Sequence, residues 1–308
     1  MIEKKTVGEI ARLWKEDKRK YVKYSTFAAY ALILEDHILP EFEERTGLGE
    51  RDVQEFVLKK IKGGLSTKSV KDILVVLRMI MSFGDRSGAW KYERWRIKFP
   101  TERTMSRMEI LDIEDHRRLL QHLQEQPSLQ NLGIYMSLTT GMRIGEICAL
   151  KWADIDLDAG TISVRRTIER IYTVENGVRH TELVIGPPKT PHSIREIPIT
   201  GALAALLQLL RESASGKDYV LTGNERPTEP RTYRNLYDRL LKRLGIPHIK
   251  FHGLRHSFAT RCIESECDYK TVSAILGHSD IRTTLNLYVH PNMEQKKRCI
   301  DKMVSFVR

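Results

Sequence analysis

The periodicity of the apolar residues breaks once along this chain, over residues 91–108, and that break limits the folds open to it. Before the break, apolar residues recur at helical spacing in four stretches. Within it the chain is polar and basic, contains Pro100 and shows no sustained period. After about residue 110, helical stretches and short β-prone pieces are mixed. We therefore expect two domains, residues 1–92 and 110–308, joined by a basic linker at 93–109, and 308 residues are enough for both to have a core.

The first domain is predicted to be all helical. A capping box that begins at Thr6 opens the first helix. The second helix is expected to begin near Ser25 and to stop before Pro40, because proline lacks the amide hydrogen that a helix interior needs. The third begins near Glu50 and the fourth follows Ser66. Their apolar stripes indicate a packed core rather than a cofactor site.

The net charge of the chain points to a polyanionic partner. Lysine and arginine exceed aspartate and glutamate by a formal charge of +11. Nucleic acid and an anionic membrane surface are the two candidates, and no apolar run approaches the length of a membrane span. A solvated surface without a partner is the alternative that charge alone leaves open. In the first domain, the basic residues singled out are Lys15, Lys18, Arg19, Lys20 and Lys23.

The four cysteines include no C-x-x-C pair, which favours reduced thiols in a cytoplasm. The second domain is predicted to be α+β, mainly helical with a small antiparallel sheet. Helices are expected near 114–124 and 129–138, β-prone pieces at 161–164, 183–186 and 195–199, and an almost wholly helical region from Thr200 onward.

Several polar residues of the second domain stand in apolar settings. Arg143 lies between a tight glycine turn and an apolar helix, and Glu146 is one turn away on the same face. A surface ion pair is the simpler interpretation of these two. Further along, His252 and Arg255 share one face at the start of a helix, although an H-x-x-R pattern alone is common.

Two more such residues follow towards the end of the chain. Gly277 is expected to end a helix and to leave the imidazole of His278 at its terminus. Tyr288 then lies in an amphipathic helix. For a lone histidine or tyrosine, a role in the core is the more common explanation.

The order and spacing of these motifs resemble the active-site signature of tyrosine recombinases, also called phage-type integrases. The pattern is R-x-x-E, then H-x-x-R, then L-G-H, and a tyrosine ten residues later. The resemblance covers the second domain and extends to the first at Ser25-Thr26, His37-Ile38-Leu39-Pro40 and Leu65-Ser66. It implies an N-terminal all-α core-binding domain followed by an α+β catalytic domain. The segments around residues 260–264, 286–291 and 293–297 look like integrases of integrative and conjugative elements in Gram-positive bacteria.

The chemistry of the family explains these residue types. Cleaving a phosphodiester by transesterification needs a nucleophile, stabilisation of the charge on the non-bridging oxygens and a proton for the leaving oxygen. Arg143 and Arg255 suit the second task, because guanidinium groups stay protonated and bind phosphate bidentately. The resemblance implies that Tyr288 attacks to form a 3′-phosphotyrosine, that His252 exchanges its proton and that His278 binds a phosphate oxygen.

The family also supplies a lysine from a β-hairpin turn as the acid for the leaving oxygen. Lys189 fits that place, since it is the only lysine from Trp152 through Gly216. Glu146 is expected to orient Arg143 or His252. We expect no cofactor and no metal, because His252, His256 and His278 lack a zinc-binding spacing and nearby arginines would repel a cation.

The function implied is a site-specific DNA recombinase or integrase that integrates or excises a mobile element. The family implies double-stranded DNA as the partner and no membrane, with a homotetramer on two DNA sites in which the tail 291–308 docks on a neighbouring protomer. It also implies accessory partners such as an excisionase or a host DNA-bending protein. The core-binding helices begin within the first ten residues, so a preceding arm-binding domain is expected to be absent or removed. Alternatives are an Xer- or Cre-like resolvase, a type IB topoisomerase and a non-catalytic DNA-binding protein, the last disfavoured by the complete residue set.

Overall fold

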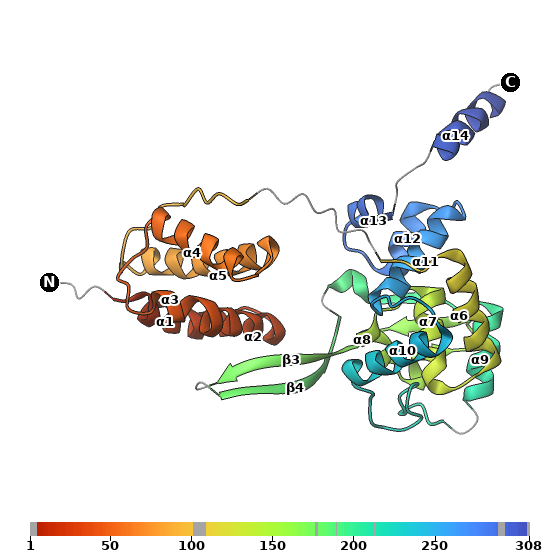
Figure 1. The fold of residues 1–308 in the computed structure, drawn as a ribbon. Coiled ribbons are helices and arrows are strands. Elements are labelled where there is room, and N and C mark those ends of the chain that lie inside the picture. Colours follow the sequence, from red (N-terminus) through yellow and green to blue (C-terminus); the bar gives the residue numbers. More distant parts are fainter. Residues whose placement is uncertain are drawn as a thin grey trace. The chain divides into compact units, whose positions relative to one another are not determined.

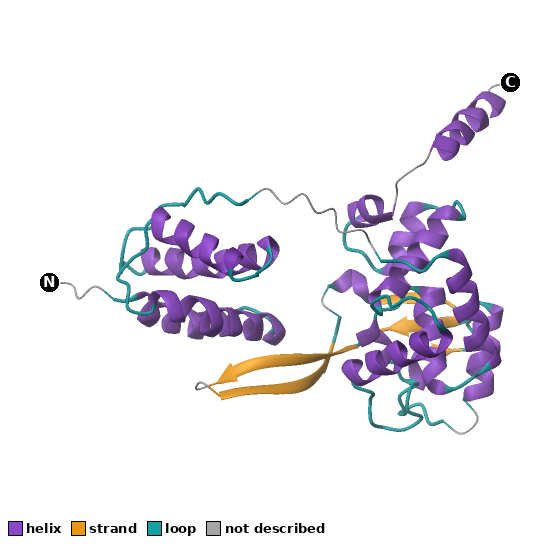
Figure 2. Ribbon diagram, in the orientation of Figure 1, coloured by secondary structure: helices purple, strands orange, loops and turns teal. Residues whose placement is uncertain are grey.

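The computed structural model divides the chain into two compact units. One unit is Met1–Met105 with Ile171–Glu182, and the other is Ser106–Arg170 with Leu183–Arg308. The first contains helices only, apart from the strand segments in 171–182, whereas helices surround a small sheet in the second (Figures 1 and 2). The predicted fold class, an all-α domain followed by an α+β domain, is confirmed. The residues that the structure describes are 5–100, 109–175, 178–188, 190–211, 214–288 and 293–306.

The helices of the first unit begin where capping residues predict them. The Thr6 hydroxyl accepts a hydrogen bond from the Glu9 amide at 3.2 Å, and the Glu9 carboxylate accepts one from the Thr6 amide at 2.7 Å. Ser66 caps the last helix in the same way. The helices are α1 (Val7–Arg19), α2 (Tyr24–Ile33), the π-helical η1 (Leu34–Ile38), α3 (Leu39–Phe42), α4 (Glu50–Lys62) and α5 (Thr67–Arg86).

The prediction that the second helix stops before Pro40 is wrong. The chain remains helical from α2 through η1 into α3, and Pro40 is the second residue of α3. In η1 the Leu39 amide donates to the carbonyl of Leu34, five residues earlier. This wider π-helical turn resets the hydrogen-bond ladder immediately before the proline, whose missing amide hydrogen is tolerated in a first helical turn.

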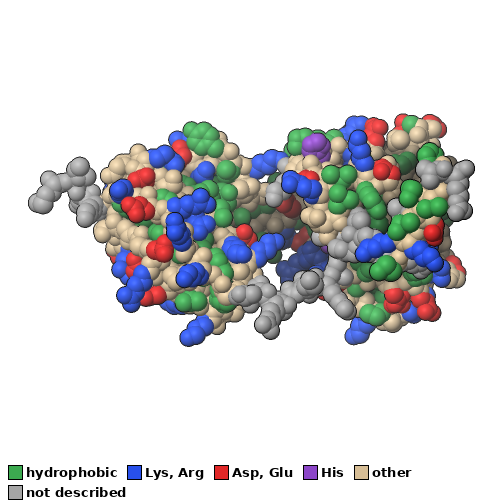
Figure 3. All heavy atoms as spheres, turned by 90° about the horizontal axis from the view of Figure 1, so that it is seen from above, with side chains coloured by type: hydrophobic (Ala, Val, Ile, Leu, Met, Phe, Trp, Pro, Cys, Tyr) green, Lys and Arg blue, Asp and Glu red, His purple; other side chains and the backbone are tan. Residues whose placement is uncertain are grey.

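The first unit has its own core and a surface rich in charge. Trp14, Leu77 and Trp95 are among its buried residues, so part of the stretch after α5 packs on these helices. Lysine and arginine side chains are spread over the face of this unit seen in Figure 3, with acidic side chains among them. Some of these basic groups have local partners, since Lys15 pairs with Glu35 at 3.1 Å. Among the described residues, no helix has the length and apolar character needed to cross a bilayer.

The second unit contains a three-stranded antiparallel sheet. Its strand order is β1-β2-β5, with Ile162 opposite Ile197 and Val164 opposite Arg195. In chain order the remaining elements are α6 (Ile113–Glu125), α7 (Leu129–Thr140), α8 (Ile144–Cys148), η2 (Trp152–Asp154), β1 (Ile155–Asp156), β2 (Thr161–Val164), β3 (Thr167–Glu175), β4 (Val178–Gly186), η3 (Pro191–Ser193), β5 (Arg195–Pro198), α9 (Gly201–Leu210), α10 (Pro230–Leu244), α11 (His252–Glu264), α12 (Tyr269–Leu276), α13 (Ile281–Tyr288) and α14 (Met293–Phe306).

Strands β3 and β4 form a separate two-stranded sheet that is much longer than the β-prone piece predicted at 183–186. The apolar residues of β3 recur at Ile168, Ile171 and Val174, every third position, so they do not alternate as a half-buried strand would. The sequence pair Asn176-Gly177 is a common hairpin signal and could have revealed both strands, although it lies outside the described residues.

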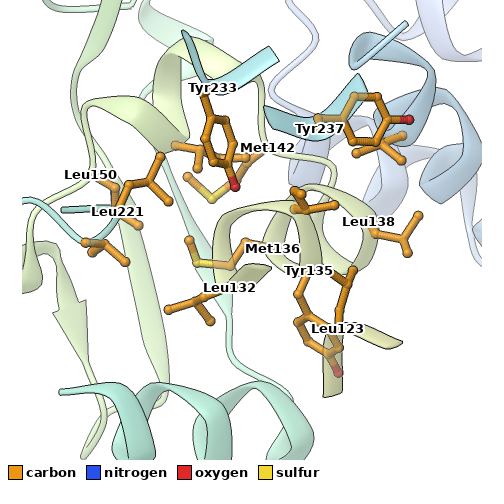
Figure 4. Packing of buried hydrophobic residues seen from close by; sticks show 14 of the residues in the cluster. Leu123, Leu132, Tyr135, Met136, Leu138, Met142, Leu150, Leu221, Tyr233 and Tyr237 are labelled. Atoms are coloured by element: carbon orange, nitrogen blue, oxygen red, sulfur yellow. The ribbon is translucent and has the colours of Figure 1, made fainter. Parts of the chain in front are cut away.

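Helix α7 lies in the core of the second unit. Its residues from Leu132 to Leu138 are buried, as expected for a helix that is apolar all round. Figure 4 shows Leu132, Met136 and Leu138 packed in a cluster with Leu123 of α6 and Tyr237 of α10. The end of this rigid helix therefore fixes where the next residues of the chain lie, and these include Arg143.

Candidate active site

A left-handed glycine starts the turn that presents Arg143. Gly141 has φ +67°, and a Cβ at this position would lie 2.6 Å from Leu276 Cδ2. The Arg143 amide donates to Glu146 Oε2 at 2.9 Å, and its Nη1 donates to Oε1 at 2.8 Å. The Glu146 side chain is only 2% exposed, whereas that of Arg143 is 35% exposed. The pair is therefore not a surface ion pair, and its guanidinium retains access to a ligand.

Arg195 is a second partner of Glu146 that the sequence analysis did not identify. Its Nη2 donates to Oε2 at 2.9 Å, its Nη1 donates to Oε1 at 3.1 Å, and its side chain is 6% exposed. Burial raises the pKa of Glu146, but hydrogen bonds and charges from Arg195 and Arg143 outweigh burial and leave that pKa below its ordinary value. The carboxylate thus stays ionised although it is buried.

Arg255 lies deeper in the same region. It is 1% exposed, and its Nη1 and Nη2 donate to the carbonyls of Gly141 and Leu276, each at 2.8 Å. Burial and the charge of Arg143 lower the pKa of Arg255 to about 9, so its guanidinium remains protonated at neutral pH. These two carbonyls take two of its five N–H donors.

Two of the predicted histidines are neutral at physiological pH. His252 keeps solvent exposure, yet desolvation by the surrounding protein, followed by the charges of His256 and Arg255, lowers its pKa to about 4. Burial, followed by Arg255 and Arg143, lowers the pKa of His278 to about 4 as well. The Nδ1 atom of His278 lies 2.8 Å from the Thr284 hydroxyl, which holds the ring in place.

The turn before His278 leaves no space for a larger residue. Gly277 ends α12 as predicted, with φ +66°. A Cβ on this residue would lie 2.9 Å from the His192 carbonyl oxygen and 3.0 Å from Arg195 Cδ. Close approach of β5 and the preceding turn therefore sets the position of the imidazole.

Tyr288, at the end of α13, lies beside these groups. It is 7% exposed, and its ring is stacked on that of His278 with centroids 6.5 Å apart. Its hydroxyl lies 2.7 Å from Nδ1 of His256. Burial raises the pKa of Tyr288, although Arg255 and Arg143 act in the opposite direction. The sequence analysis considered His256 only as a metal ligand and missed this contact.

The arrangement combines a buried phenol, neutral imidazoles and guanidinium groups on a fixed framework. Such a set can bind a phosphodiester through the arginines and bring a nucleophilic oxygen to its phosphorus. The structure thus brings the predicted site residues together, apart from Lys189, which lies outside the described residues.

Comparison with known protein families identifies two matching models. Residues 109–295 match the phage integrase family, and residues 6–46 match the phage integrase N-terminal SAM-like domain. The first match includes most of the second unit, and the second match lies in the first unit.

Known relatives are similar along most of their length. A tyrosine recombinase XerC-like protein of Caldanaerobacter subterraneus subsp. tengcongensis is 27% identical, over 97% of this chain and 82% of the relative. The ICEBs1 integrase of Bacillus subtilis is 25% identical, over 82% of this chain and 70% of the relative.

Solved structures share the fold. The Tn1549 transposon integrase in complex with a circular intermediate DNA superposes with a TM-score of 0.76 at 22% identity, covering 97% of this chain and 99% of that one. A lambda integrase tetramer bound to a Holliday junction gives a TM-score of 0.66 at 17% identity, covering 95% and 80%.

Proposed function

The chain belongs to the phage integrase family, and from this we propose that Tyr288 is the nucleophile with which this site-specific recombinase cuts and rejoins DNA. The observation that carries the assignment is the position of the Tyr288 phenol, whose hydroxyl lies 2.7 Å from Nδ1 of His256 and whose ring stacks on His278. Burial raises the pKa of Tyr288, and the charges of Arg255 and Arg143 oppose that rise. A phenol ordinarily ionises near pH 10, so positive charge beside it favours attack at neutral pH.

Arg143, Arg255 and His278 bind the non-bridging oxygens of the scissile phosphate in this proposal. Arg143 is partly exposed and can reach a ligand, while Arg255 is held by two backbone carbonyls with further donors left for the phosphate. Preorganised donors of this kind stabilise the charge that develops in the transition state. Glu146 is a positioning residue that holds the Arg143 fork.

The bond changes balance without a high-energy cofactor. The Tyr288 oxygen bonds to phosphorus as the bond from phosphorus to the 5′-oxygen breaks, which leaves a 3′-phosphotyrosine and a 5′-hydroxyl. A 5′-hydroxyl of a partner strand then reverses the step. We assign the proton for the leaving oxygen to Lys189, and the exchange of the tyrosine proton to the histidines beside the phenol, with His252 at the family position.

The wider assembly follows from the same proposal. Residues 1–92 bind the core DNA site, residues 93–109 link the two domains, and residues 110–308 catalyse strand cleavage and rejoining. The protein acts in a bacterial cytoplasm. Four protomers act on two sites, with an excisionase or a host DNA-bending protein setting direction. In support, α14 exposes apolar side chains that suit a neighbouring protomer: Met293, Ile300, Met303 and Phe306. Family membership supports DNA binding itself.

A covalent-trapping assay tests the nucleophile. The protein and its Tyr288→Phe variant are incubated with nicked DNA from the sequence flanking the gene, without added metal, and adducts that survive SDS are counted. We expect an adduct with the wild type alone. An adduct with both would show that another residue attacks, and binding without an adduct in either would favour a non-catalytic DNA-binding protein. Adducts on any duplex, with relaxation of supercoils, would favour a topoisomerase.

A further inference from the structure

His256 is the residue in direct contact with the hydroxyl proposed to react. Its Nδ1 lies 2.7 Å from the Tyr288 oxygen, across 32 positions of sequence. Among the described side chains, His256 alone is hydrogen-bonded to that hydroxyl. His278 directs its own Nδ1 to Thr284. The family-position histidine, His252, meets the ring of His256 edge-on, with centroids 4.6 Å apart. His256 therefore lies between the phenol and His252.

The charge states of the two groups allow the Tyr288 hydroxyl to donate this hydrogen bond to His256. Burial raises the pKa of Tyr288, so the phenol carries its proton at neutral pH. Burial and the charge of Arg255 lower the pKa of His256, so its imidazole is neutral. A neutral phenol can donate, and a neutral imidazole has one nitrogen with a free lone pair. In the tautomer that carries its ring proton on Nε2, Nδ1 accepts the hydrogen bond from the hydroxyl.

We propose that His256 accepts the proton of the Tyr288 hydroxyl as that oxygen attacks the phosphodiester. This inference rests on the proposed role of Tyr288. The electron pair of the O–H bond stays on the phenol oxygen, which bonds to phosphorus, and the proton moves to Nδ1. When a 5′-hydroxyl attacks the phosphotyrosine, the imidazolium returns the proton to the departing phenol oxygen.

The charges around the His256 imidazole favour its neutral form, so a proton taken from Tyr288 is held only briefly. The groups that face His256 are His252 and Arg255 on its own helix and Tyr288 on α13. Without DNA, Arg255 disfavours an imidazolium. A bound phosphate brings negative charge to the arginines and removes part of that penalty, which makes His256 a better base when the substrate is in place.

Two substitutions separate proton uptake from hydrogen bonding. In His256→Asn, the amide oxygen can take the place of Nδ1 as an acceptor but cannot hold a proton near neutral pH. In His256→Ala, both functions are lost. We measure single-turnover cleavage of the nicked substrate at saturating protein, after checking folding by circular dichroism and DNA binding by gel shift. His248→Asn, at an exposed histidine that pairs with Asp238, is the matched control.

General-base catalysis is worth about 10²–10⁴-fold, so we expect both His256 variants to bind DNA normally and to cleave at least ~100-fold more slowly. Added imidazole is expected to restore part of the rate to His256→Ala. An asparagine variant that cleaves within about threefold of the wild type would overturn the inference and leave His256 as a hydrogen-bond partner only; the control variant sets that threshold. A slow alanine variant that added imidazole does not rescue would also count against proton uptake.

The same assay separates this inference from the proposed function. A wild type that forms no adduct, or a Tyr288→Phe variant that forms one, removes the assignment of Tyr288 itself. A Tyr288-dependent adduct that forms at the wild-type rate in His256→Asn removes the role of His256 alone.

Discussion

Arg195 donates hydrogen bonds to both carboxylate oxygens of Glu146 from a strand that lies 49 residues further along the chain. The pair joins β5 to the start of α8, and Arg143 shares the same carboxylate. The buried Glu146 carboxylate, held by two guanidinium groups, fixes the direction of the Arg143 side chain. Removing Arg195 leaves a buried carboxylate with Arg143 as its remaining guanidinium partner.

We expect Arg195→Met to destabilise the protein by about 3–5 kcal/mol, because Glu146 stays buried and loses a principal partner. Urea unfolding measures the change. Arg51→Met is the control, since this arginine forms a surface i,i+4 pair with Glu55 and its loss is expected to cost less than about 0.5 kcal/mol. The double variant Arg195→Met with Glu146→Leu is expected to recover part of the loss. Equal effects of the two single arginine substitutions would refute this account.

Gly277→Ala is expected to weaken folding and to slow DNA cleavage. The substitution introduces strain at φ +66° and a Cβ 2.9 Å from the His192 carbonyl oxygen, which displaces His278. Gly245→Ala is a matched control with φ +64° and no heavy atom within 4 Å. Both are expected to lose about 1 kcal/mol through the backbone, and only Gly277→Ala is expected to lose cleavage as well. Equal cleavage by the two variants would show that the close contact does not position His278.

The half-buried His278 predicts how stability varies with pH. Burial lowers the pKa of His278 to about 4, while an unfolded histidine titrates near 6.5. Between these values the unfolded chain binds more protons, so stability rises with pH from about 4 to about 6.5 and falls on acidification. In His278→Gln, urea unfolding across this range is expected to show a shallower slope, whereas His180→Gln, at an exposed position, is expected to keep it. An unchanged slope in His278→Gln would contradict a neutral buried imidazole.

Removal of residues 292–308 is expected to leave DNA binding by single protomers intact and to disrupt the assembly of four. The physical reason is the loss of the exposed apolar side chains of α14. Gel shift measures binding, and sedimentation of the complex on two sites measures assembly. The point variant Phe306→Glu tests the same surface without truncation. Unchanged recombination by the truncated protein would refute a docking role.

Local signals predicted much of the fold and the positions of the chemistry. The capping residues Thr6 and Ser66 and the helix-ending Gly277 act on neighbours within a few residues, so a single segment contains the whole signal. The prediction of a helix end before Pro40 also used a local signal. It was wrong because a π-helical turn, which sequence periodicity does not predict, offsets the effect of the proline.

The site contacts that the sequence did not predict join segments that are distant along the chain. In the sequence, Arg195 is one residue of a β-prone piece, and only the fold shows that it contacts Glu146 of α8. In the same way, His256 is a neighbour of Arg255 in the sequence, and only the fold shows its contact with Tyr288 of α13. The spacing of motifs could therefore predict which residues the family uses. Finding the partners that orient these residues required the three-dimensional fold.

The two carbonyls that accept from Arg255 belong to the C-terminal ends of α7 and α12, where helix dipoles place partial negative charge. The proposed phosphate-binding cation therefore also caps two helices at once. Loss of Tyr288 removes one reactive group from the end of a helix, whereas loss of Arg255 removes the hydrogen bonds that link the ends of α7 and α12. Inactive descendants of this protein that still bind DNA are thus expected to have lost the tyrosine and kept the arginine.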